Sequence, residues 1–428
     1  MSSVYIKFYG DLWVTSQNVT YDKYVTQADY IFCNLETPVT DETNGTLKSG
    51  PVLEGSLSGF EAVIEGLSKK QMVFSLANNH MGDHAEQGIL DTIKACEKNN
   101  IIYGGVSRGN QYKPLFIQTS EGRIGVIFVS DKEFGISLDN RLGVDYITPH
   151  LYTAIIDARK QCDILILSIH SSSEWNCWPS PTWQDTLRSF VDCGVDFVYG
   201  HHSHVPQGWE KYKAGWIVYG LGNFVVPTYR FQSKENSLWS LCVSIEIEDK
   251  KIQRVNMTPL DIHVNNSASS IEILESTSDK HKEYLDRCND PLSNRQLLTG
   301  LWQSFAFMRF ESMLSSFQKT ADKQIQLIPQ SKLTRIRHMW HVLRNRYDKI
   351  MSDTAKYSIV KKELGKDTPE CRAIYNWYAC MPHKDVMETV FSVLTGQQDD
   401  YRTDQTNEFV KRYVFDNGDI DALNYFFK

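Results

Sequence analysis

With 428 residues, the chain is too long for one ordinary hydrophobic core, and roughly 100–200 residues per domain predicts two or three domains. Its apolar content of 41% and charged content of 23% are those of a globular protein. The net charge of −7 argues against a generally basic nucleic-acid binder, so we expect no nucleic-acid partner. No segment approaches the ~18 consecutive apolar residues of a membrane span, so we expect none.

The nine cysteines are scattered and form no Cys-x-x-Cys pair. This spacing indicates neither a disulfide framework nor a thiolate zinc site, and reduced thiols are the simplest account. The first residues lack a basic segment followed by an apolar stretch. We therefore expect a cytoplasmic protein.

Strands and helices alternate through the first half of the chain. The expected strands are 4–8, 29–35, 72–77, 123–129, 163–169, 195–198 and 216–219, and the expected helices are 60–69, 88–98, 151–161 and 182–193. Residues 238–248 and 251–257 alternate around a polar turn and predict a hairpin. Such a chain predicts an α/β sheet covered by helices on both faces, with antiparallel strands added at its end.

The composition changes near residue 265, where a Ser- and Asn-rich stretch over 265–270 is a candidate linker. No convincing strand pattern follows, so we divide the chain into an α/β domain at 1–264 and an all-helical domain at 265–428. The helical patterns cover 271–288, 295–319, 332–350, 370–380 and 384–395. One of them, Lys332 to Lys349, is strongly basic. It is typical either of a helix that binds an anionic lipid or polymer, or of an exposed basic face over a buried stripe.

Polar residues follow several of the expected strands. These residues are Asp11, Glu36, Asn79, His80, His170, Glu174, His202 and His204. Open α/β sheets bind ligands at the carboxyl ends of their strands. Carboxylates, an amide oxygen and imidazoles suit manganese, iron(II), zinc or nickel. Two such cations about 3.5–4 Å apart can activate water and orient a phosphoryl group, so the pattern predicts phosphoester hydrolysis.

Each residue also has an ordinary interpretation. Asp11 and Glu36 are possible helix caps, and Asn79 after Asn78 is typical of a tight turn. His170 at the end of a buried strand can be a hydrogen-bonded core histidine, and Glu174 can be merely solvated. His202 and His204 are spaced i, i+2, which at a strand end would turn both imidazoles the same way.

In order and spacing, several of these segments resemble one known family. They are Gly10-Asp11, Asn34-Leu35-Glu36, Ala77-Asn78-Asn79-His80 with Asp83, His170-x-x-x-Glu174, Gly200-x-His202-x-His204-Val205 and Leu221-Gly222-Asn223-Phe224. The family is the CapA/PgsA-type capsule and poly-γ-glutamate biosynthesis proteins, which in turn resemble the calcineurin-like metallophosphoesterases. The resemblance covers about residues 4–262.

The resemblance implies a four-layer αββα sandwich with two divalent metal ions, of which manganese, iron and zinc are the expected types. By motif, Asp11 and His204 would bind the first metal, and Asn79, His170 and His202 the second. Glu36 would stand at the position of the bridging aspartate, and His80 would contact the phosphate and protonate the leaving group. Trp13 departs from the phosphoesterases, which usually place a histidine ligand there, and Glu174 is a candidate replacement.

Substrate contacts are expected from Asn78, Glu174 and Trp175. Trp175, Trp178 and Trp183 follow His170 closely and could stack on a sugar or base ring, or pack helices. We therefore expect a phosphoesterase of the capsule-synthesis type that acts on a phosphorylated small molecule or sugar phosphate. The alternatives are a non-catalytic accessory subunit, docked to polymer-synthesis enzymes by its helical domain, and metal-dependent amide chemistry on a glutamyl polymer.

Overall fold

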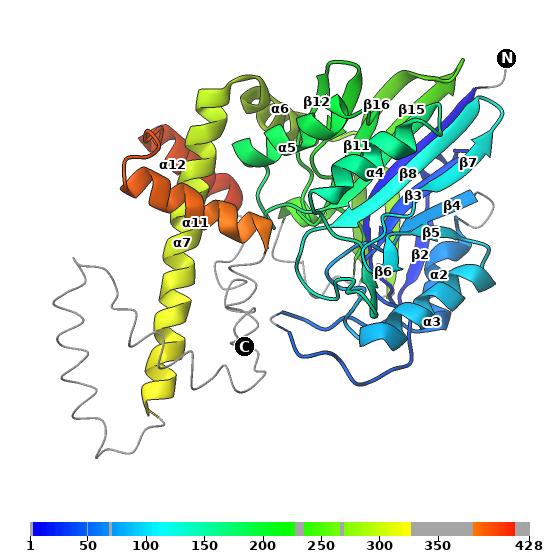
Figure 1. The fold of residues 1–428 in the computed structure, drawn as a ribbon, viewed down its shortest axis with the longest axis horizontal. Helices are drawn as coiled ribbons and strands as arrows, with labels where there is room; N and C mark the ends of the chain where they lie inside the picture. The colour runs from blue at the N-terminus through cyan, green and yellow to red at the C-terminus, as the bar shows by residue number, and fades with distance from the viewer. Residues whose placement is uncertain are drawn as a thin grey trace.

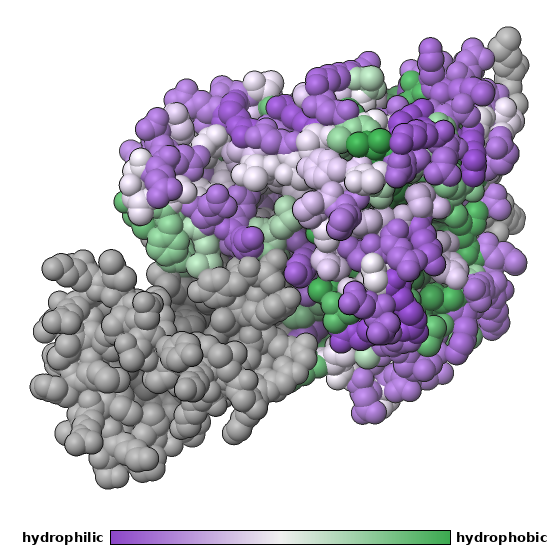
Figure 2. Space-filling view, in the orientation of Figure 1, coloured by the Kyte–Doolittle hydropathy of each residue, from purple (hydrophilic) through white to green (hydrophobic). Residues whose placement is uncertain are grey.

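The computed structural model describes residues 3–48, 50–67, 71–226, 235–265, 269–326 and 380–415. Two β-sheets face each other, helices cover their outer faces, and a group of helices lies beside them (Figure 1). The expected α/β architecture with helices after it is therefore confirmed. The visible surface of the described residues is mostly hydrophilic, with apolar residues scattered across it (Figure 2).

The larger sheet has nine strands, and its continuous path has the order β2-β17-β16-β15-β1-β3-β4-β5, with β14 paired to β1. Strands β1, β3, β4 and β5 run parallel, whereas β15, β16 and β17 are antiparallel. The bounds are β1 Val4–Leu12, β2 Asn18–Tyr21, β3 Tyr30–Leu35, β4 Gln71–Ser75, β5 Ile102–Gly104, β14 Asn223–Val225, β15 Trp239–Glu248, β16 Lys251–Asn265 and β17 Ser270–Glu275.

The smaller sheet has six strands in the order β12-β13-β11-β10-β8-β7, of which β8, β10, β11 and β13 are parallel. The bounds are β7 Leu115–Thr119, β8 Gly122–Ser130, β10 Ile164–His170, β11 Phe197–His201, β12 Trp209–Tyr212 and β13 Gly215–Val218. A separate ribbon pairs β6 Val106–Arg108 with β9 Leu142–Val144. The expected hairpin is β15 and β16, and the sheets are mixed, as the sequence indicates.

Three buried layers of apolar side chains explain why these elements stack. One layer joins the two sheets, a second joins the larger sheet to α2 and α3, and a third joins the smaller sheet to α4 and α5. The helices that cover the sheets are α1 Lys23–Thr26, α2 Leu57–Glu65, α3 Ala85–Lys98, α4 His150–Arg159 and α5 Pro181–Asp192. Helix, sheet, sheet and helix give the αββα order (Figure 1).

Local sequence sets where some of these helices begin. The side chain of Ser180 accepts a hydrogen bond from the backbone N–H of Trp183, and Pro181 stands in the first turn of α5. Ser56 caps α2 in the same way through Gly59. Both residue types are favoured at these positions because they satisfy or lack an N–H that the helix leaves free.

The helical part contains α6 Asp279–Asn289, α7 Arg295–Gln326, α11 Met381–Leu394 and α12 Asp404–Val410. A 3₁₀ turn, Asp290–Ser293, links α6 to α7, and a π-helical turn, Lys411–Phe415, follows α12. Buried Leu298 and Trp302 of α7 and Val386 of α11 belong to the same apolar cluster as the layer between the sheets. In the described residues, we find no helix with the length and apolar character needed to cross a membrane.

The expectation that no strand follows residue 265 is wrong. Residues Ser270–Glu275 form β17, which pairs with β16 and β2, so the larger sheet extends to residue 275. Ile271 and Ile273 are fully buried and alternate with polar residues, which is a period of two over a stretch too short to distinguish from a helix. The patterns at 332–350 and 370–379, including the basic segment, lie outside the described residues. The division into two domains stays a prediction.

The register of the parallel strands places the polar residues at one edge of each sheet. Asp11 of β1 pairs with Asn34 of β3 in the larger sheet. His170 of β10 lies between Ser130 of β8 and His201 of β11 in the smaller sheet. Because the two sheets are stacked face to face, their carboxyl edges meet at one place.

The loop over residues 219–223 passes between these edges, where glycines leave room for its backbone. A Cβ on Gly10 would lie 1.8 Å from the carbonyl oxygen of Gly222, and a Cβ on Gly200 would lie 2.0 Å from that of Tyr219. The backbone N–H of Asp11 donates to Gly222, and that of Leu221 donates to Gly200. Glycine at positions 10 and 200 therefore allows the 219–223 loop to contact both sheets beside the polar residues.

Phe8 lies between the sheets and tests how much the sandwich depends on that layer. Its ring centroid is 5.0 Å from that of Phe32 and 4.7 Å from those of Phe197 and Tyr199. We expect Phe8→Ala to lower the free energy of unfolding by about 3–5 kcal/mol, measured by chemical denaturation. Phe391→Ala is the control, because that ring is 48% exposed, and it should change stability by about 0.5 kcal/mol or less. Equal losses in the two variants would contradict this account of the core.

Candidate metal centre

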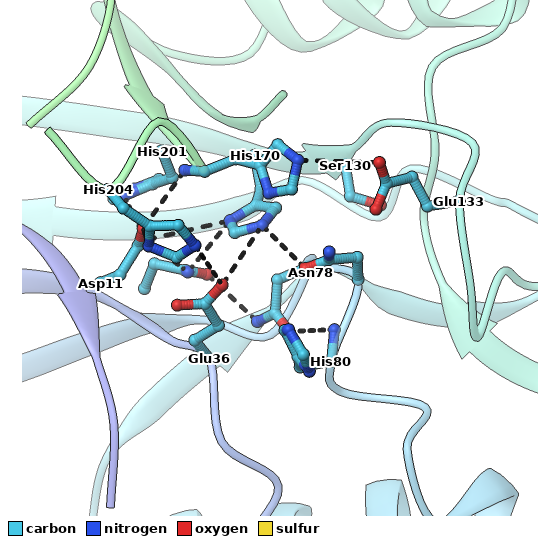
Figure 3. A network of polar contacts seen from close by, with 12 residues as sticks. Asp11, Glu36, Asn78, His80, Ser130, Glu133, His170, His201 and His204 are labelled. Carbon is cyan, nitrogen blue, oxygen red and sulfur yellow. Dashed lines mark hydrogen bonds and ion pairs between the residues drawn. The ribbon is translucent and has the colours of Figure 1, made fainter. Parts of the chain in front are cut away.

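Side chains from both sheets converge at the shared edge. Asp11, Glu36, His170, His201 and His204 point toward one another in Figure 3. Asp11 and Glu36 belong to the end of the larger sheet, and the histidines to the end of the smaller one. The structure thus brings together the predicted residues that lie almost 200 positions apart in the chain.

Asp11 is contacted by polar groups from several elements. It is fully buried, and its Oδ1 accepts a hydrogen bond of 2.8 Å from the amide of Asn34 and lies 3.2 Å from His201 Nδ1. Its Oδ2 accepts from the backbone N–H of His202 and lies 3.5 Å from His204 Nδ1. Asp11 is therefore fixed by groups from both sheets.

Glu36 is also fully buried and uses its two oxygens differently. The indole N–H of Trp13 donates to Oε2, whereas Oε1 is buried without a hydrogen-bond partner among the described residues. Oε1 lies 3.7 Å from His170 Nε2 and 3.9 Å from His204 Nε2. Trp13 thus contacts the carboxylate at the centre instead of supplying a histidine ligand, and Glu36 presents one free oxygen to two imidazoles.

The imidazoles of His170 and His204 are oriented by amide side chains. Asn34 Nδ2 lies 3.1 Å from His170 Nδ1, and Asn79 Oδ1 lies 3.1 Å from His170 Nε2. Asn223 Oδ1 lies 3.0 Å from His204 Nδ1, which leaves His204 Nε2 to face Glu36. Outer partners of this kind fix the ring orientation of histidine ligands.

His202 and His204 do not lie on a strand. Strand β11 ends at His201, and His202 and His204 have φ values of 80° and 57°, in the left-handed region. The prediction that His202 and His204 lie on a strand end, with their rings turned the same way by the i, i+2 spacing, is therefore wrong. A tight turn brings the two rings together instead, with their centroids 6.1 Å apart.

The resulting groups suit cation binding. Three sets of side chains have ligand atoms within 4.8 Å of one another: Asp11, Glu36 and His204; Glu36, His170 and His202; and Glu174, His202 and His204. Contacts of 3.5–3.9 Å are too long for good hydrogen bonds. They are close to the spacing of atoms that share one cation. Together with the unpartnered Glu36 oxygen, this spacing shows that the residues present fit divalent metal ions.

Burial and neighbouring charge shift the pKa values of the two carboxyl groups in opposite directions. Burial would raise the pKa of Asp11, but the hydrogen bond with His201 and the nearby imidazoles hold it well below its usual range. Burial, and then the charge of Asp11, raise the pKa of Glu36 well above its usual value. Burial also lowers the pKa values of His170 and His204, which favours the neutral imidazole that binds metals.

His80 lies beside the centre and belongs to a separate polar group. Its Nδ1 lies 2.8 Å from Asp83 Oδ2 and 3.1 Å from Lys48 Nζ, and Lys48 also pairs with the other oxygen of Asp83. Burial, and then the charge of Lys48, lower the pKa of His80, whereas Asp83 raises it. His80 is in none of the ligand groups among the described residues, which agrees with its expected place next to the metals.

The residues expected to contact substrate lie in different surroundings. Asn78 is buried and its amide accepts from the backbone N–H groups of His80 and Met81, so it shapes the loop that presents His80. Glu174 lies with His202 and His204, as a replacement ligand would. The Trp175 ring centroid is 5.1 Å from that of His204. Binding of substrate by these three residues stays a prediction.

The other two tryptophans of that loop pack inside the protein. Trp178 is buried between the sheets and the helical part, where its indole N–H donates to the carbonyl of Arg287. Trp183 is buried against the smaller sheet. Their structural interpretation is therefore correct, and of the three only Trp175 contacts a histidine of the centre.

Several residues of the centre were missed by the sequence analysis as site residues. Asn34, Asn223 and His201 orient its carboxylate and imidazoles, and Glu133 Oε1 lies 3.6 Å from His202 Nε2. A signal for Glu133 existed, since Ser130-Asp131-Lys132-Glu133 follows β8 as the other polar residues follow their strands. Asn34 and Asn223 stand within the motifs already noted.

Comparison with known proteins agrees with this geometry. Residues 16–228 match the model of a family described as bacterial capsule synthesis protein PGA_cap. This matched stretch, just under half of the chain, is similar in sequence to that family. The region includes Glu36, His80 and His170 together with His201, His202 and His204, but it begins after Asp11, so the family match covers most of the candidate metal centre.

Two relatives are capsule or PGA biosynthesis proteins. The chain is 28% identical over 279 residues to the capsule biosynthesis protein CapA of Bacillus anthracis, covering 62% of this chain and 65% of that protein. It is 29% identical over 243 residues to the PGA biosynthesis protein CapA of Bacillus subtilis, covering 55% and 62%. The match thus spans less than two thirds of the length of either relative.

Solved structures show a weaker likeness. A phosphatase from Mycoplasma pneumoniae superposes with a TM-score of 0.39 at 13% identity, covering 68% of this chain and 99% of that chain. A putative 5′-nucleotidase from Staphylococcus aureus superposes with a TM-score of 0.36 at 11% identity, covering 67% and 58%.

Asp11→Asn tests the centre as a metal site. Loss of the charge should lower the total of bound manganese, iron and zinc by about one ion per chain or more, measured by elemental analysis after dialysis. Asp157→Asn on α4 is the control, because that carboxylate is exposed and forms an ion pair with Lys160, and it should leave the metal content unchanged. Equal metal content in both variants would argue against Asp11 as a ligand.

Proposed function

We propose that this chain is a divalent-metal-dependent phosphoester hydrolase of the capsule-synthesis type. Its substrate would be a phosphorylated small molecule or sugar phosphate in the biosynthesis of a surface polymer. The single observation that supports hydrolysis most strongly is the grouping of Asp11, Glu36, His170, His202 and His204, with one Glu36 oxygen buried and unpartnered. The family match supports the place in capsule synthesis.

Two bound cations would supply charge stabilisation for a phosphoryl group and an activated water. The residues of the chain would bind these cations and orient the ligands. Asp11 and Glu36 would balance the positive charge, and His170, His202 and His204 would complete the ligand set. Asn34 would hold Asp11 and His170 in register through one amide group, since its Nδ2 contacts both.

His80 would act on the leaving group. Asp83 and Lys48 hold its Nδ1, so Nε2 is the nitrogen available to a substrate oxygen. A proton delivered from Nε2 to the departing alcohol would stabilise the developing charge on that oxygen. General acid catalysis of this kind is worth roughly 10²–10⁴-fold in rate.

A second candidate function is supported by a different observation. Two mycobacterial relatives, 29% identical over 169 residues, are named as probable polyglutamine synthesis accessory proteins, and the match covers 36% of this chain and 44% of each. By that analogy, this chain would be an accessory subunit of a polymer-synthesis complex, or act on the amide bonds of a glutamyl polymer. The described helical part, with Phe391 and Leu394 exposed on α11, would then be the docking surface. We also propose that the protein is located in the cytoplasm.

His80→Gln separates the hydrolase from the accessory role. In phosphate release from a panel of sugar phosphates and nucleotides, we expect kcat to fall by roughly 10²–10⁴-fold with unchanged metal content, because His80 is not a ligand. His150→Gln is the control, because that side chain is exposed at the start of α4. An accessory protein would show no phosphate release from the metal-loaded wild type and full polymer synthesis in cells that carry His80→Gln. Release of glutamate or short peptides in place of phosphate would favour the amide chemistry.

A further inference from the structure

A second group of metal-ligating side chains lies where the helical part meets the smaller sheet. Glu133 follows β8, whereas Cys380 and His383 stand at the start of α11, about 250 positions later in the chain. Their ligand atoms lie within 4.8 Å of one another. The expected function does not use this group.

The contacts within the group are close and buried. The Sγ of Cys380 lies 3.1 Å from Glu133 Oε1, and Cys380 is fully buried while Glu133 is 6% exposed. The Nδ1 of His383 is buried and has no hydrogen-bond partner among the described residues. A buried imidazole nitrogen without a partner costs free energy unless something binds it, so the site is incomplete as it stands.

The surrounding backbone holds the three residues in place. The N–H of Met381 donates to both oxygens of Asp131, at 3.0 and 3.3 Å, so a carboxylate lies at the start of α11. An acidic group at a helix N-terminus stabilises the helix. This contact fixes Cys380 and, one turn later, His383 against the loop that carries Glu133. The group is therefore built by two segments that pack tightly together.

We propose that Glu133, Cys380 and His383 bind a divalent cation of the zinc type, which joins α11 to the sandwich. One thiolate, one imidazole and one carboxylate form a typical ligand set for Zn²⁺. Ligand atoms on one tetrahedral zinc lie roughly 3.3–3.5 Å apart, given bond lengths of about 2.0–2.3 Å, and the 3.1 Å Cys380–Glu133 contact is near that spacing.

The protonation of the group agrees with this role. Burial lowers the pKa of His383 to about 4, with a further lowering by Arg309, so the imidazole is neutral and able to bind a metal. Burial, and then the charges of Glu133 and Asp131, raise the pKa of the Cys380 thiol, so without a cation the thiol keeps its proton and donates it to Glu133. A bound cation would take the place of that proton.

The site would stand next to the first metal centre but would differ from it in chemistry. His202 Nε2 lies 3.6 Å from Glu133 Oε1, so one imidazole separates the two. The first centre contains carboxylates and imidazoles and no sulfur among the described residues. A thiolate ligand therefore distinguishes the second site by spectroscopy. Because this site joins α11 to the smaller sheet, the position of the helical part would depend on whether a cation is bound there.

Cobalt substitution of the full chain is the test. Co²⁺ bound to a thiolate gives a near-ultraviolet sulfur-to-metal charge-transfer band, which the histidine–carboxylate centre does not give. We expect the band in the wild type, its loss in Cys380→Ser, and its retention in Cys193→Ser, a control thiol that is partly exposed after α5. Asp11→Asn should keep the band while it loses metal from the first centre, so the two proposals fail separately.

His383→Gln provides a second test that keeps the thiol. Loss of one ligand should weaken cobalt binding at the band by about tenfold or more, and circular dichroism should show an unchanged fold. A wild type without the band, or a band that persists in Cys380→Ser, would overturn the proposal. Unchanged affinity in His383→Gln would overturn the assignment of His383.

Discussion

The burial of two carboxylates at one point between the sheets is the constraint on which the rest of the structure depends. Asp11 and Glu36 are both fully buried, and an isolated buried carboxylate is costly unless it is paired or bound to a metal. The protein supplies Asn34, Trp13 and the backbone of His202 as hydrogen-bond donors, yet one Glu36 oxygen stays without a donor among the described residues. In the proposed function, divalent cations would balance the remaining negative charge.

The sandwich makes that concentration of polar groups possible. Phe8 and its ring neighbours hold the sheets together below the centre, and the parallel strands end at the same level in both sheets. Gly10 and Gly200 let the 219–223 loop approach both edges, and this loop supplies Asn223 to His204. Apolar packing therefore sets the positions, and the polar groups at the strand ends set the chemistry.

The sequence predicted most of the α/β part because polar residues stand at or beside the ends of several strands and the helices that cover the sheets have apolar faces. It predicted the convergence of Asp11, Glu36, His170 and His204 but not the turn that orients the last of these. β17 was taken for the start of a helix because its alternation covers only six residues. The contact of Cys380 with Glu133 could not be predicted, since no local pattern relates residues 247 positions apart. Trp13 shows the same limit: its spacing revealed a missing ligand, and only the structure shows that its indole binds Glu36.

A crystal structure of the manganese-loaded protein, with an anomalous difference map, tests the central claim most directly. The account predicts two peaks, one between Asp11, Glu36 and His204 and one between Glu36, His170 and His202, each within about 2.0–2.3 Å of the ligand atoms. No peak at this edge of the sheets under saturating manganese, or peaks only at surface carboxylates, would contradict it.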